Sequence, residues 1–307
     1  MSRGAADARI DAILACVRKT PDVPITLRCN AGDVFVYQDP GAADDSPAGP
    51  EFNAKRDLEI LHRLNLPPGC TLPARAIFHR VLDRIEDVVG LCGFPTVTSD
   101  AWKGCPKADR GLYQKGRAKG IAALVRPRDD EEMKSDKRQS LDAMYRADVI
   151  TVRPHILLCA VCQYGNGTRP PYPPDNLPEL IELILKRPDT LIAMARGADW
   201  MMCAPCPDRA PDLSACVTHR GAGGLPNQVR DLRVLQKLGL SYGSTLKARE
   251  LYTLILERIP GTLEVCRFEH PYPSVWWDPC AATPANSEGY EKGRQMLLAR
   301  LVKQPGL

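Results

Sequence analysis

Aromatic side chains are scarce in this chain, and it has no long apolar run. Phe, Trp and Tyr together make up 6% of its 307 residues, so we expect a core built mainly from Leu, Ile, Val and Ala. The longest apolar run, Ile156 to Cys162, is far too short to span a bilayer. No apolar stretch follows the first residues, so we expect neither an export signal nor a membrane segment.

The chain also lacks an excess of charge of either sign. It has 41 Lys and Arg against 37 Asp and Glu, a net charge of +4, which gives no electrostatic case for binding nucleic acid. The phosphate-loop, zinc-protease, nucleophile-elbow and dinucleotide-binding motifs do not occur. The length favours two domains in an ordinary globular protein.

Cysteine is what the chain has in excess. There are 12 cysteines, and without an export signal the expected compartment is the reducing cytoplasm. Grouped cysteines there indicate metal ligands or redox groups rather than disulfide bridges. The chemistry of this protein should therefore be sought where the cysteines cluster.

A long segment of the chain matches another part of the same chain. Residues 53–85 align without gaps to residues 227–259, and 15 of the 33 positions are identical. Weaker matches follow, at Cys92 with Cys266 and at Tyr113–Arg117 with Tyr290–Arg294. Upstream, Ile25–Arg28 is similar to Ile150–Arg153. The match predicts a tandem duplication of one α+β unit.

The two copies differ in their cysteines. We expect a degenerate copy over residues 20–125, serving as scaffold or lid, and a cysteine-rich copy over 148–307. The fold class expected is α+β, predominantly helical, with a pseudo-two-fold arrangement of the copies. The charged run Arg126–Arg138 is the expected linker, itself able to form a helix.

Apolar periodicity and turn residues predict the individual elements. Helices are expected over about 6–18 and 177–186, and over two repeated pairs whose second helix starts at the N-cap candidates Thr71 and Thr245. Cys16 is expected in the core beside Ile10, Ile13 and Val17. Short strands are expected at Pro24–Arg28, Val34–Tyr37, Asp148–Arg153 and Thr190–Met194.

Five cysteines within one window carry the strongest chemical signal. They are Cys159, Cys162, Cys203, Cys206 and Cys216. Two residues between cysteines allow a tight turn to direct both sulfurs at one metal centre. The prolines in Cys203-Ala204-Pro205-Cys206-Pro207 stiffen the second of these turns. The alternative is that these cysteines are small buried apolar residues.

The same window resembles a known family. Arg153-Pro154-His155-Ile156-Leu157-Leu158-Cys159, followed by Tyr164-Gly165-Asn166-Gly167, is similar to the R-P-H-H-L-L-C … G-x-G-Y opening of domain-of-unknown-function family 1284. That family continues with C-x-x-C-P, a further Cys, a helix pair and cysteines around a Trp; here Cys203 to Pro207, Cys216, the repeated helix pair, then Cys266, Trp276 and Cys280 follow. The resemblance covers about residues 148–307 and implies iron–sulfur binding. Ile156 replaces the second His, and Glu291 stands where another Cys is expected, so no second metal site is expected near the C-terminus.

Iron–sulfur and zinc are both compatible with these donors. Two C-x-x-C pairs are the donor set of structural zinc, whereas a fifth cysteine fits a 4Fe-4S cluster with a spare ligand better. With the resemblance, an iron–sulfur cluster is favoured and zinc is the alternative. The expected ligands are Cys159, Cys203, Cys206 and Cys216, with Cys162 as the alternate to Cys159.

Two residues beside Cys159 are candidates for catalysis. His155 is a ligand, a proton-handling group beside the metal, or an ordinary buried His that fixes a turn. Arg153 is an anion contact or, more simply, half of an ion pair with Asp57 or Asp231. Asp199 either accepts a hydrogen bond before the second C-x-x-C or is an ordinary turn residue.

The function expected is that of a cytoplasmic iron–sulfur protein. It is a cluster-dependent enzyme if three thiolates leave one iron open to substrate, and its partners are then a small molecule or a redox protein, with no nucleic acid and no membrane. The alternative is a zinc-stabilised interaction module without catalysis.

Overall fold

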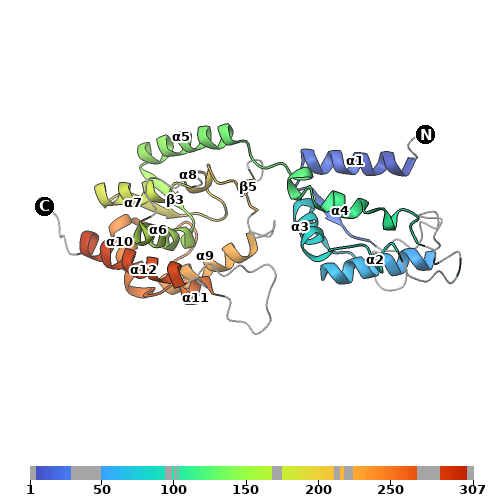
Figure 1. Cartoon of the computed structure of the whole chain (residues 1–307). Coiled ribbons are helices and arrows are strands. Elements are labelled where there is room, and N and C mark those ends of the chain that lie inside the picture. Colours follow the sequence, from blue (N-terminus) through green and yellow to red (C-terminus); the bar gives the residue numbers. More distant parts are fainter. Residues whose placement is uncertain are drawn as a thin grey trace. The chain divides into compact units, whose positions relative to one another are not determined.

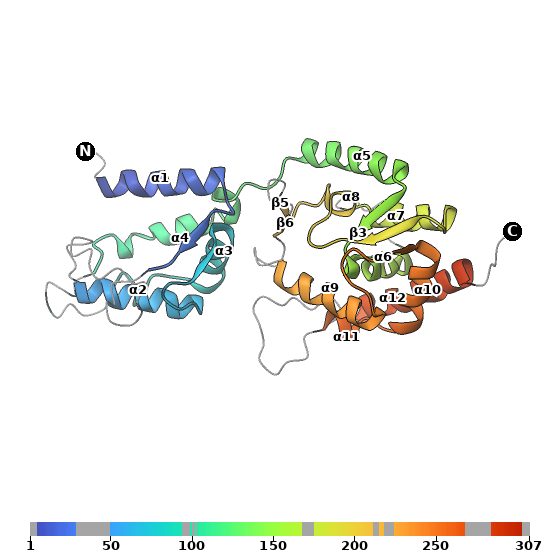
Figure 2. The same ribbon diagram turned by 180° about the vertical axis from the view of Figure 1, so that it is seen from behind.

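The computed structural model describes residues 5–28, 50–93, 99, 102, 104–167, 175–210, 215–217, 224–267 and 284–302. The chain forms two compact units, Met1–Pro127 and Arg128–Leu307, shown from opposite sides in Figures 1 and 2. The boundary lies inside the expected linker. The expected strand Val34–Tyr37 lies outside the described residues. No helix among those described is long and apolar enough to cross a membrane.

The first unit is an α+β arrangement with a two-stranded sheet. Its elements are α1 (Ala5–Lys19), β1 (Pro24–Thr26), α2 (Pro50–Leu64), β2 (Thr71–Pro73), α3 (Ala74–Arg84) and α4 (Leu112–Arg117). Strands β1 and β2 are antiparallel, with Ile25 opposite Leu72. Leu64, Ile85 and Leu91 form one buried cluster, and Val17, Phe52 and Ile77 are buried as well.

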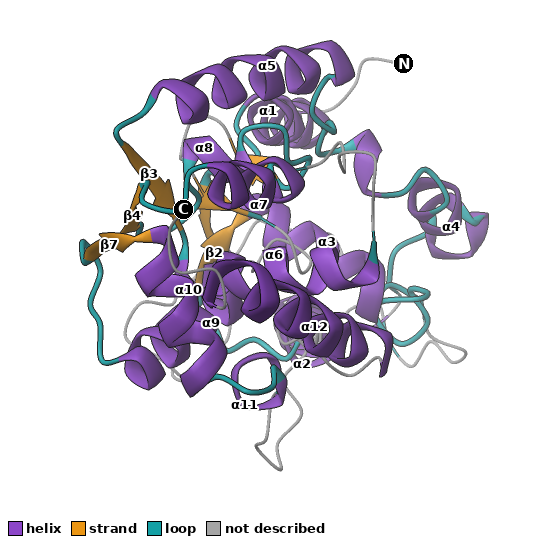
Figure 3. Cartoon of the chain, turned by 90° about the vertical axis from the view of Figure 1, so that its left-hand side faces the viewer, coloured by secondary structure: helices purple, strands orange, loops and turns teal. Residues whose placement is uncertain are grey.

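The second unit is larger and also α+β. Its elements are α5 (Asp130–Arg146), β3 (Val149–Val152), α6 (Pro154–Asn166), α7 (Leu177–Lys186), β4 (Leu191–Met194), α8 (Trp200–Cys203), β5 (Arg209–Ala210), β6 (Ala215–Cys216), α9 (Gly224–Leu238), β7 (Thr245–Lys247), α10 (Ala248–Arg258), α11 (Leu263–Cys266) and α12 (Pro284–Leu297), followed by a π-helical turn (Leu298–Val302). The main sheet has the order β3-β4-β7, with β3 parallel and β7 antiparallel to β4. Figure 3 shows β3, β4 and β7 side by side.

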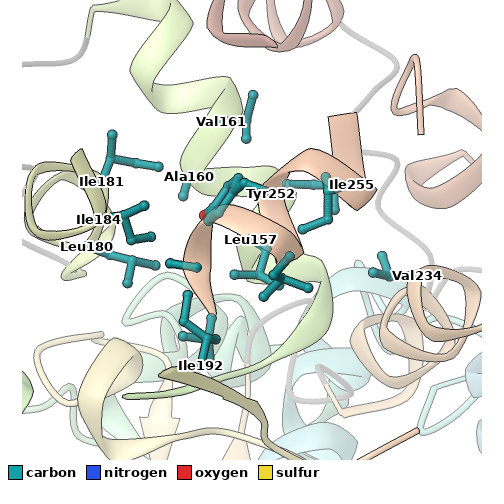
Figure 4. Packing of buried hydrophobic residues seen from close by; sticks show 14 of the residues in the cluster. Leu157, Ala160, Val161, Leu180, Ile181, Ile184, Ile192, Val234, Tyr252 and Ile255 are labelled. Atoms are coloured by element: carbon teal, nitrogen blue, oxygen red, sulfur yellow. The ribbon is translucent and has the colours of Figure 1, made fainter. Parts of the chain in front are cut away.

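Helix α6 is the centre of the second unit. Pro154 in its first turn favours helix initiation, and Gly167 ends it in the left-handed conformation with φ 66°. The helix packs against α7, α9 and α12, and Leu157, Ala160 and Val161 are fully buried. Figure 4 shows these side chains among residues from α7, β4, α9 and α10.

Glycines allow α6 and α12 to cross at very short range. A Cβ on Gly165 of α6 would collide with the backbone of Gly289, and one on Gly293 would collide with the carbonyl oxygen of Val161. A Cβ on Gly289 would meet the Asn166 side chain. Gly289 and Gly293 are four residues apart, so both lie on one face of α12, and the small residues let the two backbones touch.

The repeated sequence folds in the same way in both units. When 174 is added to the bounds of α2, β2 and α3, they become those of α9, β7 and α10. The aligned tyrosines also make the same bond: Tyr113 donates to the carbonyl of Ile85 at 2.6 Å, and Tyr290 to that of Ile259 at 2.7 Å. Local sequence therefore specifies this helix–strand–helix segment independently in each unit.

The strand that precedes the repeat needs a correction. Strand β1 pairs with β2 as β4 pairs with β7, so Ile25–Arg28 corresponds to β4 and not to Ile150–Arg153 in β3. The turns before β1 and β4 agree as well, since Asp22 pairs with Arg75 at 3.1 Å and Asp189 with Arg249 at 3.9 Å. The sequence signal is Lys-x-Pro-Asp, which ends both α1 and α7.

Two other predictions were wrong at the level of single residues. Thr71 and Thr245 do not cap helices; each begins a three-residue strand, and α3 and α10 start only after it. Cys16 is exposed, as are Ile10 and Ile13, whereas Val17 of the same helix is 1% exposed. The periodicity located α1 correctly but overestimated how much of its apolar face is covered.

We expect Gly293→Ala to destabilise the protein by about 1–3 kcal/mol, because the added methyl group must force α6 and α12 apart. The matched control is Gly116→Ala in α4, the aligned position, where a Cβ would meet nothing within 4 Å. That change should be neutral or stabilise by up to about 1 kcal/mol through helix propensity. Urea unfolding measures both, and equal effects of the two changes would contradict the crossing.

Candidate functional site

Three of the five expected cysteines gather around a short hairpin in the second unit. Cys203 ends α8, and the Cys206 N–H donates to its carbonyl at 3.0 Å, which closes a turn. The Arg209 N–H then donates to the Cys206 carbonyl at 3.1 Å, and Arg209 pairs with Cys216 across β5 and β6. We call Cys203, Cys206 and Cys216 the thiol cluster.

Burial controls the charge of the thiol cluster. Burial, together with the smaller effects of the Cys206 and Cys216 thiols, raises the pKa of Cys203 to about 12, while Arg153 acts in the opposite direction. Burial likewise raises the pKa of Cys206 to about 11; the backbone hydrogen bond from Asp208 opposes this, whereas the Asp208 charge and Cys216 add to it. Cys203 and Cys206 are therefore protonated at neutral pH unless a cation compensates the thiolates.

Arg128 fixes the loop that carries the thiol cluster. Its Nη1 donates to the carbonyls of Ala204 and Cys206 at 2.7 and 2.8 Å. Its Nη2 donates to Asp136 of α5 at 2.5 Å, and its side chain is only 7% exposed. The C-x-x-C turn is thus tied to α5 by a buried, charge-assisted contact.

A second group of polar residues is buried where β3 passes into α6. Arg153 donates through Nε and Nη2 to one carboxylate oxygen of Asp231, at 3.0 and 2.7 Å. The backbone N–H of His155 donates to the other oxygen at 3.1 Å, and His155 Nδ1 lies 2.6 Å from it. Arg153, His155 and Asp231 form what we call the buried triad. The ion pair expected for Arg153 is therefore made with Asp231.

The charges of the buried triad follow from these contacts. Burial alone would raise the pKa of Asp231, but the hydrogen bond from His155 and the charges of His155 and Arg153 hold it below its usual value. Burial lowers the pKa of His155 despite the neighbouring carboxylate. At neutral pH the imidazole is therefore neutral and donates Nδ1–H to Asp231, so the lone pair lies on Nε2.

Helix α9 connects the buried triad to the thiol cluster. Asn227, Arg230 and Asp231 lie on one face of it. Asn227 Nδ2 lies 3.4 Å from Cys216 Sγ, and Arg230 donates to Asn227 Oδ1 at 2.8 Å. One turn of α9 thus contacts both groups.

The first C-x-x-C pair does not form the expected tight turn. Cys159 and Cys162 lie within α6 and pack against the core. Burial raises the pKa of Tyr252 and of Tyr290, and the nearby Cys159 and Cys162, respectively, add to this effect. The apolar periodicity around this pair makes a helix, on which the two side chains, three residues apart, share a face that packs against the core.

Among the described residues, no group of three or more His, Cys, Asp or Glu side chains is placed to hold a metal ion. Cys266 packs in the core beside Tyr290. Trp276 and Cys280, expected near the metal, lie outside the described residues.

Of the two alternatives for Asp199, the structure shows the hydrogen-bond acceptor, with bonds from Thr151 Oγ1 at 2.6 Å and from the Met202 N–H at 3.3 Å. Sequence reasoning missed three other contributors: Asp231 as the partner of His155, Asn227 beside Cys216, and Arg128. The repeated Asn-x-x-Arg-Asp motif pointed to the first two, because its polar residues lie on one face of an otherwise apolar helix. Nothing in the sequence singled out Arg128.

Comparison of the chain with family models, with curated proteins and with solved structures gave no match. The likeness to family 1284 therefore rests on the residues quoted above.

We expect Asp231→Asn to destabilise the second unit by about 3–5 kcal/mol, because it leaves the buried Arg153 charge without its partner. Stability should also depend less on pH. In the native protein the pKa values of Asp231 and His155 both lie below their unfolded values, so stability is fully present above about pH 7 and is lost as pH falls.

Chemical unfolding between about pH 4 and pH 8 measures this dependence. The control is Asp142→Asn, whose carboxylate is exposed and pairs with Arg146 at 3.8 Å; a change within about 0.5 kcal/mol is expected there. An Asp231→Asn protein with native stability and an unchanged pH profile would show that the buried triad does not support the fold.

Proposed function

We propose that the second unit binds a thiolate-ligated metal centre, an iron–sulfur cluster, through Cys203, Cys206 and Cys216. The observation that supports this most is that backbone hydrogen bonds and the β5–β6 pairing bring Cys203, Cys206 and Cys216 onto one loop and hairpin, although their side chains are not placed as a metal-binding group in this structure. Burial keeps Cys203 and Cys206 protonated, and a bound soft cation would lower their pKa values and release the protons to solvent, because coordination supplies the missing positive charge.

The donor set favours three protein thiolates over four. Cys159 and Cys162 pack against the core around α6, so the proposed ligand set does not include them. An iron–sulfur cluster held by three thiolates offers one iron with an open coordination position, which supplies Lewis-acid or electron-transfer chemistry. The reaction class we propose is therefore the conversion of a small molecule that approaches this open position.

The buried triad provides the proton and charge control for such a reaction. His155 carries its lone pair on Nε2, which can accept a proton, while Asp231 fixes the tautomer and ring orientation. Arg153 lowers the pKa of Cys203 and so favours anionic sulfur beside it. Asp231 acts through His155 and Arg153 and is a positioning residue.

Zinc is the second candidate, because Cys203-x-x-Cys206 is also a zinc knuckle. The unit would then be a metal-stabilised interaction module. The Asn227 contact with Cys216 Sγ is compatible with either metal, since hydrogen bonds to ligand sulfurs occur in both types of site.

Cys203→Ser and Cys206→Ser should each abolish metal retention and lower stability, because metal binding and folding are coupled. Protein purified or reconstituted without oxygen is assayed for iron, sulfide, zinc and visible absorption. The matched control is Cys105→Ser, an exposed cysteine of the first unit, which should leave metal content unchanged. A brown wild-type protein supports the cluster, and a colourless one with stoichiometric zinc supports the alternative. Full metal content in either of the first two variants would refute the site.

We also infer that the chain arose by tandem duplication and that α1-β1-α2-β2-α3 and α4 correspond to α7-β4-α9-β7-α10 and α12. The shared element bounds and the paired tyrosines support this. So do Arg117 and Arg294, whose Nε atoms donate to the carbonyls of Leu82 and Leu256 at 3.2 and 2.8 Å. The pseudo-two-fold arrangement of the copies stays a prediction.

The duplication predicts matched effects of matched substitutions. Tyr113→Phe and Tyr290→Phe each remove one hydrogen bond to a helix-end carbonyl and should each cost about 1 kcal/mol, more at Tyr290 because it is the more buried of the two. Urea unfolding followed separately for each unit measures this. A stabilising effect at one tyrosine with a destabilising effect at the other would contradict equivalent roles.

A further inference from the structure

In the second unit, β3 and α6 cover one surface of the fold. We propose that the corresponding surface of the first unit binds a strand–helix segment of a partner protein. The proposal rests on the correspondence of the two units and is independent of the metal. The second unit shows which geometry covers this surface: a strand parallel to β4, followed by an apolar helix that crosses α12 through glycines.

Helix α1 exposes apolar side chains at positions where the corresponding side chains of α7 are buried. The alignment of α1 with α7 follows from equivalent backbone hydrogen bonds at their ends. The Thr20 N–H donates to the Cys16 carbonyl at 2.8 Å, and the Arg187 N–H donates to the Leu183 carbonyl at 2.7 Å. In this alignment Ile10 and Ile13 are each 55% exposed, whereas their counterparts on α7, facing α6, are 3% and 0% exposed. Those counterparts are Leu177 and Leu180.

Helix α4 shows the same difference. Its Leu112 is 52% exposed and aligns with Gly289, which contacts α6 in the second unit. Gly116 aligns with Gly293, and a Cβ on Gly116 would meet nothing within 4 Å. The small residue that permits the close crossing is therefore present in α4, although no described helix crosses it there.

The layer beneath is correspondingly less buried. Tyr252 and Ile255 of α10 are fully buried and lie near α6 in Figure 4. Their counterparts on α3, Phe78 and Val81, are only partly buried. The missing cover thus reduces burial on three helices of the first unit in the same direction.

The sheet of the first unit lacks the equivalent strand as well. Among the described residues β1 pairs with β2 alone, whereas its counterpart β4 pairs with β7 on one side and with β3 on the other. The edge of β1 that corresponds to the β3 side is the natural place for an added parallel strand. The recipient surface, as we define it, consists of Ile10, Ile13, Leu112, Gly116 and this edge of β1.

The charges identify what the partner segment should carry. In the second unit Asp231 receives Arg153 and the first turn of α6. The corresponding Asp57 is 29% exposed and lies 3.7 Å from Arg56. The segment that covers the second unit has an apolar strand, a basic residue and a helix with small residues on its buried face, and we expect the partner segment to have the same order.

The comparison of the units also identifies apolar residues that do not belong to the surface. Leu58 and its counterpart Leu232 are both exposed, and so are Val89 and Leu263. Exposure that both units share is ordinary for a soluble protein. Leu58 is therefore a matched control within the same unit.

The test uses a fluorescent synthetic peptide of residues 148–167, which contain β3 and α6, added to the full-length chain. Anisotropy should show saturable binding, weakened about tenfold or more by Ile13→Asp and by Leu112→Asp, the loss expected when a buried apolar contact becomes a charge. Leu58→Asp should leave the affinity unchanged. Each variant alters an exposed side chain, so circular dichroism should show a native fold.

A peptide carrying Leu157→Asp should bind at least about tenfold more weakly, because that side chain belongs to the buried face. Absence of saturable binding by the native peptide would overturn the proposal, as would equal affinities for the Ile13→Asp and Leu58→Asp proteins. Cys203→Ser should not alter peptide binding, so failure of the metal site and failure of this surface are separate results.

Discussion

The second unit depends on burying α6, and two constraints make that possible. The carboxylate of Asp231 accepts from Arg153 and from the first turn of α6, which offsets the cost of burying a guanidinium and an orphan helix N–H. At the other end, Gly165 and Gly293 allow α12 to pack directly on the α6 backbone. Between these two contacts, Leu157 and Val161 complete the core.

The same constraint positions the candidate chemistry. Asp231 fixes Arg153 and His155 at the start of α6. Asn227, on the same face of α9, contacts Cys216. The contact between α6 and α9 therefore uses the same residues as the candidate site. Arg153 illustrates the overlap: its charge is neutralised by Asp231, yet it still lowers the pKa of Cys203. Changes that loosen α6 should therefore alter the thiol cluster as well.

Local patterns predicted local structure well. Helix α7 has the bounds expected from its periodicity, and the repeat located the helix–strand–helix segments in both units. The prediction failed where tertiary context decides. The spacing of Cys159 and Cys162 fits both a metal knuckle and a helix, and the surrounding Leu and Val favour the helix. Thr71 is a sound N-cap by type, but pairing with β1 makes it a strand residue.

The burial of α1 could not be predicted because it depends on a neighbour, not on the helix itself. Ile10, Ile13 and Val17 follow the same apolar period, yet only Val17 is covered. A sequence records which face is suited to burial, whereas the cover can come from another segment or another chain. The two units share one sequence pattern, and only the second has this cover. A side chain that is exposed in both units is therefore an ordinary surface residue, whereas one that is exposed only in the first unit lacks the neighbour that buries its counterpart. By this comparison of exposure, Leu58 is an ordinary surface residue, and Ile13 is part of the proposed interface.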